Sequence, residues 1–344
     1  MKHLSILLVF VICLFSCEKR QKKNYVDRPT GWKVFQTPVS ASLRGLSPVT
    51  ENIIWASGAG GTWLRTTDGG NTWNSGIIAG LDSVDFRDIE GLDASTAVAI
   101  SAGQPALVYK TTDGGQTWNK THEGTEKDFF VAMYFQRGKG TIIGDPVDGK
   151  WRILQSKELG STWREIEREP EGLEGSGSFA ASGSTLLVHN NLILFASGGI
   201  NSDIYRSEDG GMHWKKIQTP IIQGEASQGI FSITKIDDNI FVGVGGDYLQ
   251  ASLAEKNAIF SKDGGKSWAL SEGNMPSGYR SGVTYFPLHH WLITVGPSGS
   301  DFSKDGGLSW ERFSEEGFHG AVRDKSQSSI WASGSNGKIA KLTY

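Results

Sequence analysis

The sequence has very few cysteines and lacks the common patterns of metal and dinucleotide sites. Its 344 residues include only two cysteines, Cys13 and Cys17, both close to the start. Cys13 lies in an apolar signal-like stretch and Cys17 is a candidate for lipidation, so no cysteine is left for a disulfide or a thiolate nucleophile. The seven histidines show no metal-ligand spacing, and no Gly-x-Gly-x-x-Gly motif opens a helix. We therefore expect neither a metal nor a cofactor.

The chain also lacks a strong excess of either charge. Lysine and arginine number 34 against 37 aspartate and glutamate residues. Nothing in this balance indicates a nucleic-acid-binding protein. The apolar stretch from Leu4 to Phe15 is too short to cross a bilayer. With 45 glycines and little helical periodicity, the chain is expected to be all-β.

The N-terminus resembles a bacterial lipoprotein signal. A charged start precedes the apolar stretch, and Leu14-Phe15-Ser16-Cys17 resembles a lipobox, although Phe15 is bulkier than usual at its position. We expect a signal peptide over residues 1–16 and a tether over residues 17–30, with a lipid on Cys17 as the only attachment to the membrane. The protein would then lie in the bacterial cell envelope, on a periplasmic or outer-membrane surface face. Ordinary secretion with an unmodified Cys17 is the alternative.

The pattern Ser/Thr-x-Asp-Gly-Gly-x-x-Trp recurs along the rest of the chain. The aspartates of its five intact copies are Asp68, Asp113, Asp209, Asp263 and Asp305. A sixth, worn copy over residues 156–163 has Glu158 in place of the aspartate. The six tryptophans are Trp73, Trp118, Trp163, Trp214, Trp268 and Trp310. They stand roughly 42–54 residues apart, which is the spacing of one four-stranded propeller blade per repeat.

This octet has a local structural reason. Its aspartate can accept hydrogen bonds from backbone amides further along a tight turn, and paired glycines adopt the positive φ values that the hairpin needs. The tryptophan begins the next strand and is expected to pack between neighbouring sheets. The octet resembles the Asp-box, or BNR repeat, which in that group joins the third and fourth strands of a blade. We therefore assign the box aspartates a structural role rather than calcium binding or catalysis.

The two ends of the chain predict seven blades rather than six. Residues 330–334 repeat residues 54–58 as Ile-Trp-Ala-Ser-Gly, and a third strand is expected over residues 338–343. Residues 31–35 have the pattern of a fourth strand. We predict that this N-terminal strand completes the C-terminal blade, which closes the ring and removes exposed sheet edges. Residues 31–344 then form one all-β propeller domain, with six blades as the alternative.

The starts of the innermost strands surround the channel mouth of a propeller, on the rim opposite the octet hairpins. Aligned on the octets, each start has an apolar residue, a variable residue and usually a small residue. Four consecutive blades have Arg280, His319, Arg44 and Arg87 at the variable position, and the other three have Phe130, Phe179 and Gln228. Guanidinium groups in a concave mouth attract carboxylates or phosphates. In the alternative interpretation, each arginine pairs with an acidic neighbour such as Asp88 or Glu90.

Two loops reach the same rim and extend the candidate site. Blade three contributes residues 144–149, which include Asp145, and blade five contributes a long insertion that includes Asp247 and Tyr248. Longer loops on one face of a propeller often determine specificity. We therefore count these three residues among the candidate ligand-binding residues. His319 is expected to titrate near neutrality, so that binding tightens as the pH falls toward 6.

Among Asp-box propellers, the chain beyond its signal resembles the photosystem II stability and assembly factor family. That family has seven blades and an arginine patch at the channel mouth, which Arg44, Arg87 and Arg280 match, with His319 as a departure. The resemblance implies a non-enzymatic binding or assembly role. We predict a monomeric scaffold that recognises an anionic ligand, such as an acidic protein segment, peptide or glycan. A chain with a lipobox need not be photosynthetic, so the resemblance does not supply the partner.

A sialidase-like or other glycoside hydrolase is the enzymatic alternative. Its candidate groups would be Arg44, Arg87 and Arg280 on a substrate carboxylate, Tyr248, Tyr279 or Tyr285 as nucleophile, and Asp88 or Asp145 as acid. The Arg-Ile-Pro signature that opens sialidase domains is missing, and sialidases have six blades. Two-propeller xyloglucanases place their acids between domains, whereas one propeller is predicted here. The binding role is therefore preferred over the hydrolase.

Overall fold

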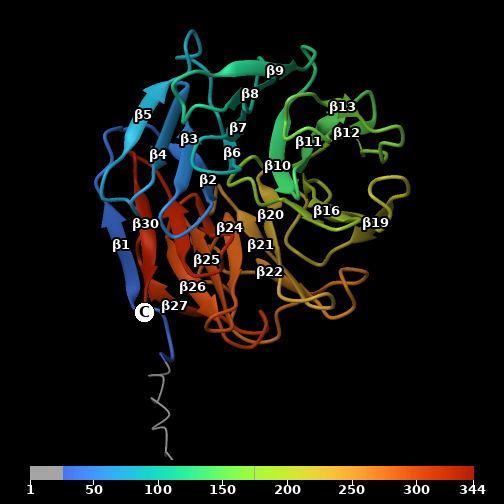
Figure 1. The fold of residues 1–344 in the computed structure, drawn as a ribbon. Helices are drawn as coiled ribbons and strands as arrows, with labels where there is room; N and C mark the ends of the chain where they lie inside the picture. Colours follow the sequence, from blue (N-terminus) through green and yellow to red (C-terminus); the bar gives the residue numbers. More distant parts are fainter. Residues whose placement is uncertain (1–25, 174) are drawn as a thin grey trace, which may run out of the picture.

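The computed structural model describes residues 26–173 and 175–344, which form a ring of seven antiparallel sheets (Figure 1). The regular elements of this part of the chain are strands. The prediction of an all-β, seven-bladed propeller is confirmed, and the six-bladed alternative is wrong. The expected signal peptide, Cys17 and most of the tether lie outside the described residues.

Blades one to three follow one another along the chain, with the first strand of each nearest the axis. Blade one contains β2 (Leu43–Pro48), β3 (Ile54–Gly58), β4 (Thr62–Thr66) and β5 (Asn74–Ile77). Blade two contains β6 (Asp88–Gly91), β7 (Ala97–Ile100), β8 (Leu107–Thr111) and β9 (Asn119–Glu123). Blade three contains β10 (Phe130–Gln136), β11 (Lys139–Val147), β12 (Lys150–Ser156) and β13 (Arg164–Glu165).

Blades four to six continue the same order. Blade four contains β15 (Leu186–His189), β16 (Leu192–Ala196), β18 (Asp203–Ser207) and β19 (Lys215–Gln218). Blade five contains β20 (Gln228–Lys235), β21 (Phe241–Asp247), β22 (Ala258–Ser261) and β23 (Ala269–Leu270). Blade six contains β24 (Gly282–Phe286), β25 (Trp291–Gly296), β26 (Gly299–Ser303) and β27 (Glu311–Ser314). Two short pieces, β14 (Ser176–Gly177) and β17 (Gly198–Gly199), extend the sheet of blade five.

Blade seven joins the two ends of the described chain. It consists of β28 (Gly320–Arg323), β29 (Ile330–Ser333), β30 (Ile339–Thr343) and β1 (Gly31–Phe35). The last two strands pair antiparallel from Gly31 opposite Thr343 to Phe35 opposite Ile339. In Figure 1 the blue β1 lies beside the red β30. The predicted ring closure by the N-terminal strand is therefore confirmed.

The octet hairpins owe their shape to hydrogen bonds within the octet. In the first copy, Asp68 Oδ1 accepts from the Thr72 amide at 2.9 Å and Asp68 Oδ2 accepts from the Thr72 hydroxyl at 2.6 Å. The Gly70 amide donates to Thr66 Oγ1 at 3.0 Å, and both glycines of the pair have positive φ. Hydrogen bonds from Thr72 and Thr66 lower the pKa of Asp68 to about 2. The aspartate oxygens are thus used by the turn, as expected.

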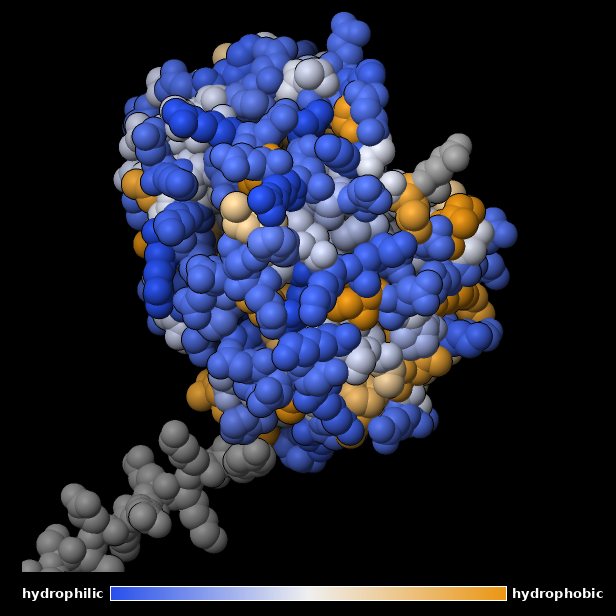
Figure 2. Space-filling view, turned by 90° about the vertical axis from the view of Figure 1, so that its right-hand side faces the viewer, coloured by the Kyte–Doolittle hydropathy of each residue, from blue (hydrophilic) through white to orange (hydrophobic). Residues whose placement is uncertain are grey.

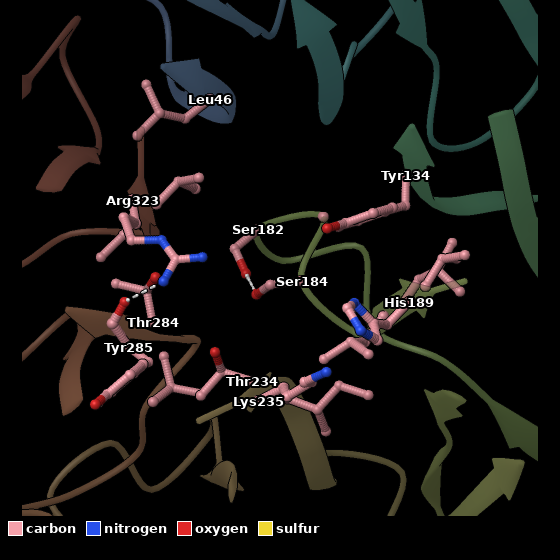
Figure 3. Close-up of a pocket in the computed structure, with 18 of the residues that line it drawn as sticks. Leu46, Tyr134, Ser182, Ser184, His189, Thr234, Lys235, Thr284, Tyr285 and Arg323 are labelled. Carbon is pink, nitrogen blue, oxygen red and sulfur yellow. Dashed lines mark hydrogen bonds between the residues drawn. The ribbon is translucent and has the colours of Figure 1, made fainter. Parts of the chain in front are cut away.

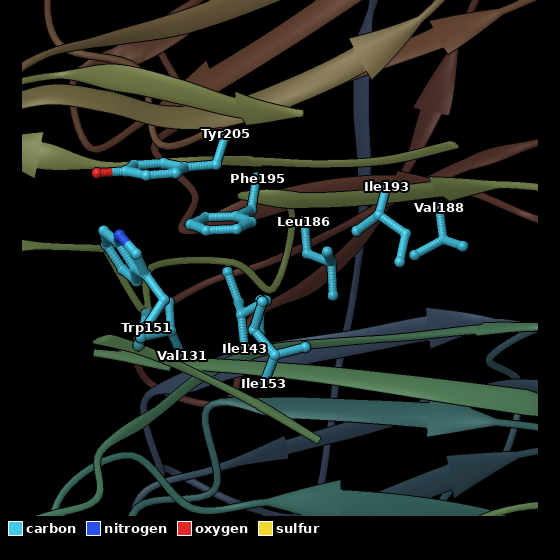
Figure 4. Packing of buried hydrophobic residues seen from close by; sticks show 11 residues of the cluster. Val131, Ile143, Trp151, Ile153, Leu186, Val188, Ile193, Phe195 and Tyr205 are labelled. Atoms are coloured by element: carbon cyan, nitrogen blue, oxygen red, sulfur yellow. The ribbon is translucent and has the colours of Figure 1, made fainter. Parts of the chain in front are cut away.

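The octet tryptophans pack between neighbouring blades. Trp118, at the end of the second box, lies 6.2 Å from Trp63 of blade one, measured between ring centroids. The space between blades three and four shows the packing most clearly (Figure 4). There the rings of Phe195 and Tyr205 stack at 4.8 Å, and Trp151 meets Phe195 edge-on at 4.9 Å. Trp151 of blade three thus packs on rings of blade four, and this contact buries apolar surface that neither blade could bury alone.

A short segment blocks the centre of the ring. Residues 180–185, called the plug here, precede β15 and lie across the channel. The Ser182 hydroxyl donates to the Ser281 carbonyl at 2.7 Å, and the Ala181 carbonyl accepts from Arg44 Nη1 at 3.3 Å. The innermost strand of blade four therefore begins at Leu186, not at Ser178 as the octet alignment predicted.

The outer surface is mostly hydrophilic on the side shown in Figure 2, where hydrophobic residues gather in small groups. Over residues 26–173 and 175–344 there is no helix with the length and apolar character of a membrane span.

Candidate functional site

A β-bulge at the start of the innermost strand places Arg44 at the channel mouth. In blade one, Leu43 pairs with Gly58 and Gly45 pairs with Ser57, which leaves Arg44 as the extra residue. Leu43 is buried in the core, whereas Arg44 is only partly buried and lines a cavity at the mouth. The bulge requires glycine on the second strand, because a Cβ at Gly58 would lie 2.0 Å from the Ser42 carbonyl oxygen.

The cavity at this end of the channel has a volume of about 460 Å³ and is called the upper mouth here. It is lined by Arg44, Arg87, Phe129, Asp145, Ser178, Phe179, Ala180, Ala181, Phe231, Tyr248, Tyr279, Ser281, Pro297 and His319. It lies at the ends of the strands opposite the octet hairpins, and the plug closes its inner end. Its size suits a peptide side chain or a small ligand.

Arg44 and Arg87 supply two guanidinium groups to the upper mouth. Burial and the neighbouring charge of Arg87 lower the pKa of Arg44, although an arginine stays charged in proteins. Arg87 Nε lies 2.7 Å from Asp85 Oδ2, and both side chains are about one-third exposed. Asp85 therefore neutralises part of this charge, while Arg44 donates to a carbonyl rather than to a carboxylate. Arg44 has the greater unmet capacity to bind an anion.

His319 lines the mouth but is not a neutral-pH sensor. Its Nε2 lies 3.0 Å from Ser42 Oγ and 3.1 Å from Ser335 Oγ. Burial, followed by the charges of Arg44 and Arg87, lowers the pKa of His319 to about 4. The ring is therefore uncharged near neutrality. The expectation that His319 titrates near neutrality is not supported, because burial and then the two neighbouring arginines disfavour its protonated form.

Arg280 is not part of the upper mouth, which corrects the sequence prediction. Its side chain is fully buried in blade six, where Nε and Nη2 lie 2.6 Å and 2.5 Å from Asp301 Oδ2. Nη2 also donates to Ser277 Oγ at 2.7 Å. The Arg280 amide donates to the Gly245 carbonyl, as the Phe86 amide of blade two donates to the Gly58 carbonyl. Arg280 therefore stands where blade two has the buried Phe86, not where blade two has Arg87.

Blades three and five also depart from the predicted alignment. Phe130 is buried between blades, and the adjacent Phe129 lines the mouth instead. Gln228 donates to Asp247 at 3.2 Å, and Phe231 lines the mouth three residues later. The bulges in β10 and β20 leave an extra residue in each strand, which an alignment based on the distant octets does not detect.

Of the three loop residues, Asp145 and Tyr248 line the mouth and Asp247 does not. Asp145 Oδ1 accepts from the Ser178 amide at 2.8 Å, and burial raises its pKa to about 6. Asp247 is buried and accepts from the Leu249 amide at 2.9 Å, so it shapes the loop. Tyr248 is 48% exposed at the rim.

Aromatic rings form the wall opposite the arginines. Phe179 and Phe231 stack at 3.7 Å with nearly parallel planes, and Tyr248 stands edge-on to both at 6.3 Å. Tyr279 meets Phe231 edge-on at 4.6 Å. The alignment predicted Phe179 and the loops predicted Tyr248, but neither indicated Phe231 or placed Tyr279 in an aromatic wall. The upper mouth thus combines cationic groups on one side with an apolar wall on the other.

The groups that a glycoside hydrolase would need are not assembled in the upper mouth. Arg280 is paired inside blade six, which leaves two arginines instead of three. Asp88 is buried beneath the plug, where its Oδ2 accepts from the Met133 amide at 2.7 Å. Tyr285 lies at the other end of the channel, and its hydroxyl is 3.1 Å from His290 Nδ1. In the described ranges, no three His, Cys, Asp or Glu side chains form a group that could hold a metal ion.

Comparison with known proteins agrees with the propeller fold. A family model described as photosynthesis system II assembly factor YCF48 matches residues 25–127. No curated protein matches the chain. The solved structure "YCF48 bound to D1 peptide" is 17% identical, with a TM-score of 0.67 over 93% of this chain and 96% of the other. YCF48 from Cyanidioschyzon merolae is 16% identical, with a TM-score of 0.64 over 91% and 98% of the two chains. The WD40 propeller of Doa1 is 10% identical, with a TM-score of 0.57 over 91% and 97%.

Proposed function

We propose that the protein is a non-enzymatic scaffold whose upper mouth binds a protein segment with an acidic group beside an apolar side chain. The main support for this proposal is that Arg44 and Arg87 line the same cavity as the stacked rings of Phe179 and Phe231. The proposal includes a monomeric protein held in the bacterial cell envelope through a lipid on Cys17, with an acidic glycan as the alternative ligand.

The two walls of the mouth fit the two halves of such a segment. An arginine guanidinium can donate two parallel hydrogen bonds to one carboxylate, and partial burial strengthens the attraction. The aromatic wall offers apolar area that a leucine or aromatic side chain of the ligand would cover. A free inorganic anion would contact only the arginines. A peptide can contact both the arginines and the aromatic wall, which is why we favour a protein partner.

The comparisons support the same class of ligand. The similar propeller solved as "YCF48 bound to D1 peptide" is a peptide-binding protein of this shape. At 17% identity this likeness concerns the fold, so it supports a peptide ligand here without naming it. The partner of the present chain would be an envelope protein with an exposed acidic and apolar segment.

Binding of synthetic decapeptides to the full chain tests the proposal. One peptide carries aspartate next to leucine, a second carries asparagine next to leucine, and a third carries aspartate next to serine. Fluorescence anisotropy should give the tightest binding for the first. In an Arg44→Gln, Arg87→Gln double variant, its Kd should rise at least about tenfold, because a charge-assisted hydrogen bond is lost at each position.

The matched control is Arg164→Gln, which removes a charge from the exposed strand β13 and should leave the Kd unchanged. Equal binding of all three peptides, or a folded double variant that binds normally, would overturn the proposal. A parallel assay of envelope glycans covers the hydrolase. Cleavage that requires Arg44 and Arg87 would replace the scaffold by an enzyme.

A further inference from the structure

The channel has a second cavity on the octet side of the ring, called the lower cavity here. Its volume is about 660 Å³. Its wall includes Glu90, Tyr134, His189, Lys235, Thr284 and Arg323, which come from blades two to seven. Figure 3 shows Arg323 and Tyr134 directed toward the centre from opposite sides. Ser182 and Ser184 of the plug form its floor, whereas Ala180 and Ala181 face the upper mouth.

Arg323 supplies the cavity with a cation that forms no ion pair in the part of the chain that the structure describes. Nη1 donates to the Tyr285 carbonyl at 3.2 Å, and across residues 26–173 and 175–344 no carboxylate forms an ion pair with this guanidinium. Burial lowers the pKa of Arg323, but the group stays charged. A half-buried guanidinium has five N–H donors, of which the protein uses one here. The remaining donors are available to an anion in the cavity.

The other charges of the wall largely cancel. Lys235 Nζ lies 2.6 Å from Asp238 Oδ1, and Lys325 Nζ lies 3.1 Å from Glu90 Oε2. Burial raises the pKa of Asp88, which favours its uncharged form beneath the plug. Arg323 forms no ion pair within the described residues, although the nearby Asp324 carboxylate acts on it, so the cavity favours negative charge at the position of this guanidinium.

Several hydroxyl groups of the wall are free to bind a polar ligand. The side-chain oxygens of Tyr134, Thr234 and Thr284 have no hydrogen-bond partner within the part of the chain that the structure describes. By contrast, the floor hydroxyls are already engaged, since Ser184 Oγ lies 2.6 Å from both Ser182 Oγ and Ser232 Oγ. The hydroxyls of the wall are therefore the ones left to bind a ligand.

We propose that the lower cavity is a second, separate binding site for a small hydroxyl-bearing molecule with one oxyanion group, a carboxylate or a phosphate. Arg323 contacts the oxyanion, and the hydroxyls of Tyr134, Thr234 and Thr284 contact the rest of the ligand. The volume matches that of ordinary small-molecule sites. The plug keeps this ligand apart from the protein segment proposed for the upper mouth, so each site can be tested without the other.

The test uses the full chain and three probes of similar size: D-glucuronate, D-glucose 6-phosphate and uncharged D-glucose. Saturation-transfer NMR at millimolar probe should show binding of at least one of the two anions and little binding of glucose. Binding of glucuronate alone identifies a carboxylate ligand, and binding of glucose 6-phosphate alone identifies a phosphate ligand. If neither anion binds, or if glucose binds equally well, the proposal is overturned.

Variants locate the bound probe. Arg323→Gln should weaken anion binding at least about tenfold, while Arg87→Gln in the upper mouth should leave it unchanged. Tyr134→Phe removes one hydroxyl without altering the fold and should weaken binding about threefold to tenfold. Loss of anion binding in Arg87→Gln but not in Arg323→Gln would place the probe in the upper mouth and refute the lower site. Decapeptide binding, measured in the same variants, should show the reverse dependence.

Discussion

Arg280 and Asp301 form an ion pair in the interior of blade six, where Asp301 Oδ2 accepts from both Nε and Nη2. Both side chains are essentially inaccessible to solvent. The matching positions of blades two and seven hold the apolar side chains of Phe86 and Phe318. Blade six has thus exchanged an apolar contact for a charged one, supported by the hydroxyls of Ser277 and Ser298.

Breaking this pair should destabilise the fold strongly. Arg280→Leu leaves the buried Asp301 carboxylate without its cation, and such a loss typically costs about 3–5 kcal/mol in the free energy of unfolding. Urea unfolding followed by tryptophan fluorescence would measure it. The double variant Arg280→Leu, Asp301→Leu removes both charges and should recover much of the loss. A single variant as stable as the parent would contradict the structural role assigned to Arg280.

Asp145 should make stability fall as the pH rises from about 4 to about 6. Its pKa is raised by burial from 3.8 to about 6 in the folded protein, so the folded state holds this proton more tightly than the unfolded state. Ionising the buried carboxyl therefore costs up to about 3 kcal/mol of stability by pH 7. The side chain of an Asp145→Asn variant does not ionise, so the stability of that variant lacks this contribution to the pH dependence. Unfolding measured at several pH values should show the parent losing stability relative to the variant across this window, and parallel curves would contradict the shift.

The same carboxyl should control ligand affinity in the upper mouth. Above pH 6 an ionised Asp145 repels an acidic segment near Arg44 and Arg87, so decapeptide binding should tighten as the pH falls from 7 to 5. Asp145→Asn should remove this dependence, with anisotropy as the measurement. His319→Gln should retain it, because burial keeps the pKa of His319 near 4. A pH dependence lost in His319→Gln would reinstate the histidine as the titrating group.

Removal of one octet carboxylate should lower thermal stability in a pH-dependent manner. Asp68→Ala deletes the acceptor of the Thr72 amide and hydroxyl bonds and should lower the Tm at pH 7. Since the pKa of Asp68 is lowered to about 2, its contribution is present above the unfolded value of 3.8 and disappears as the pH falls through 2. Calorimetry should therefore show the two Tm values converging in acid. A constant difference would mean that the turn does not depend on the charged form.

The bulge glycines should not tolerate even a methyl group. In blade five a Cβ at Gly245 would lie 1.8 Å from the Gly229 carbonyl oxygen, so Gly245→Ala should cost more than about 2 kcal/mol of stability. The control is Gly80→Ala, which meets open space but has positive φ, and should cost about 1 kcal/mol. Chemical denaturation would compare them. Equal losses would mean that the bulge can relax.

The propeller could be predicted from the sequence because its signals are local. The hydrogen bonds of each octet lie within eight residues, such as those that Asp68 accepts from the Thr66 and Thr72 hydroxyls, so the pattern can be recognised in one stretch of chain. Ring closure was also readable, because residues 330–334 repeat residues 54–58. Blade number and strand order follow from these two facts.

The upper mouth could be predicted only in part, because its geometry depends on contacts between distant residues. The bulge in β20 makes Phe231 the extra residue, and Phe231 lines the mouth in place of the predicted Gln228. In blade three Phe129, the residue before β10, lines the mouth in place of Phe130. Nothing in the local pattern of blade six indicates that Arg280 points into the sheet, because its partner Asp301 lies in another strand. In blades one, two and seven the residue that the alignment placed at the mouth does line it, and these residues are Arg44, Arg87 and His319.

The pairing of β1 with β30 has a consequence for biosynthesis. The ribosome makes β1 before the other described strands, yet its partner is the last of them, so β1 must wait while six blades are completed. The seventh blade should therefore be the slowest to form, because it requires closure of a loop that spans almost the whole chain. A circular permutant that covalently links the two ends and begins instead at a blade boundary should remove that delay and refold faster.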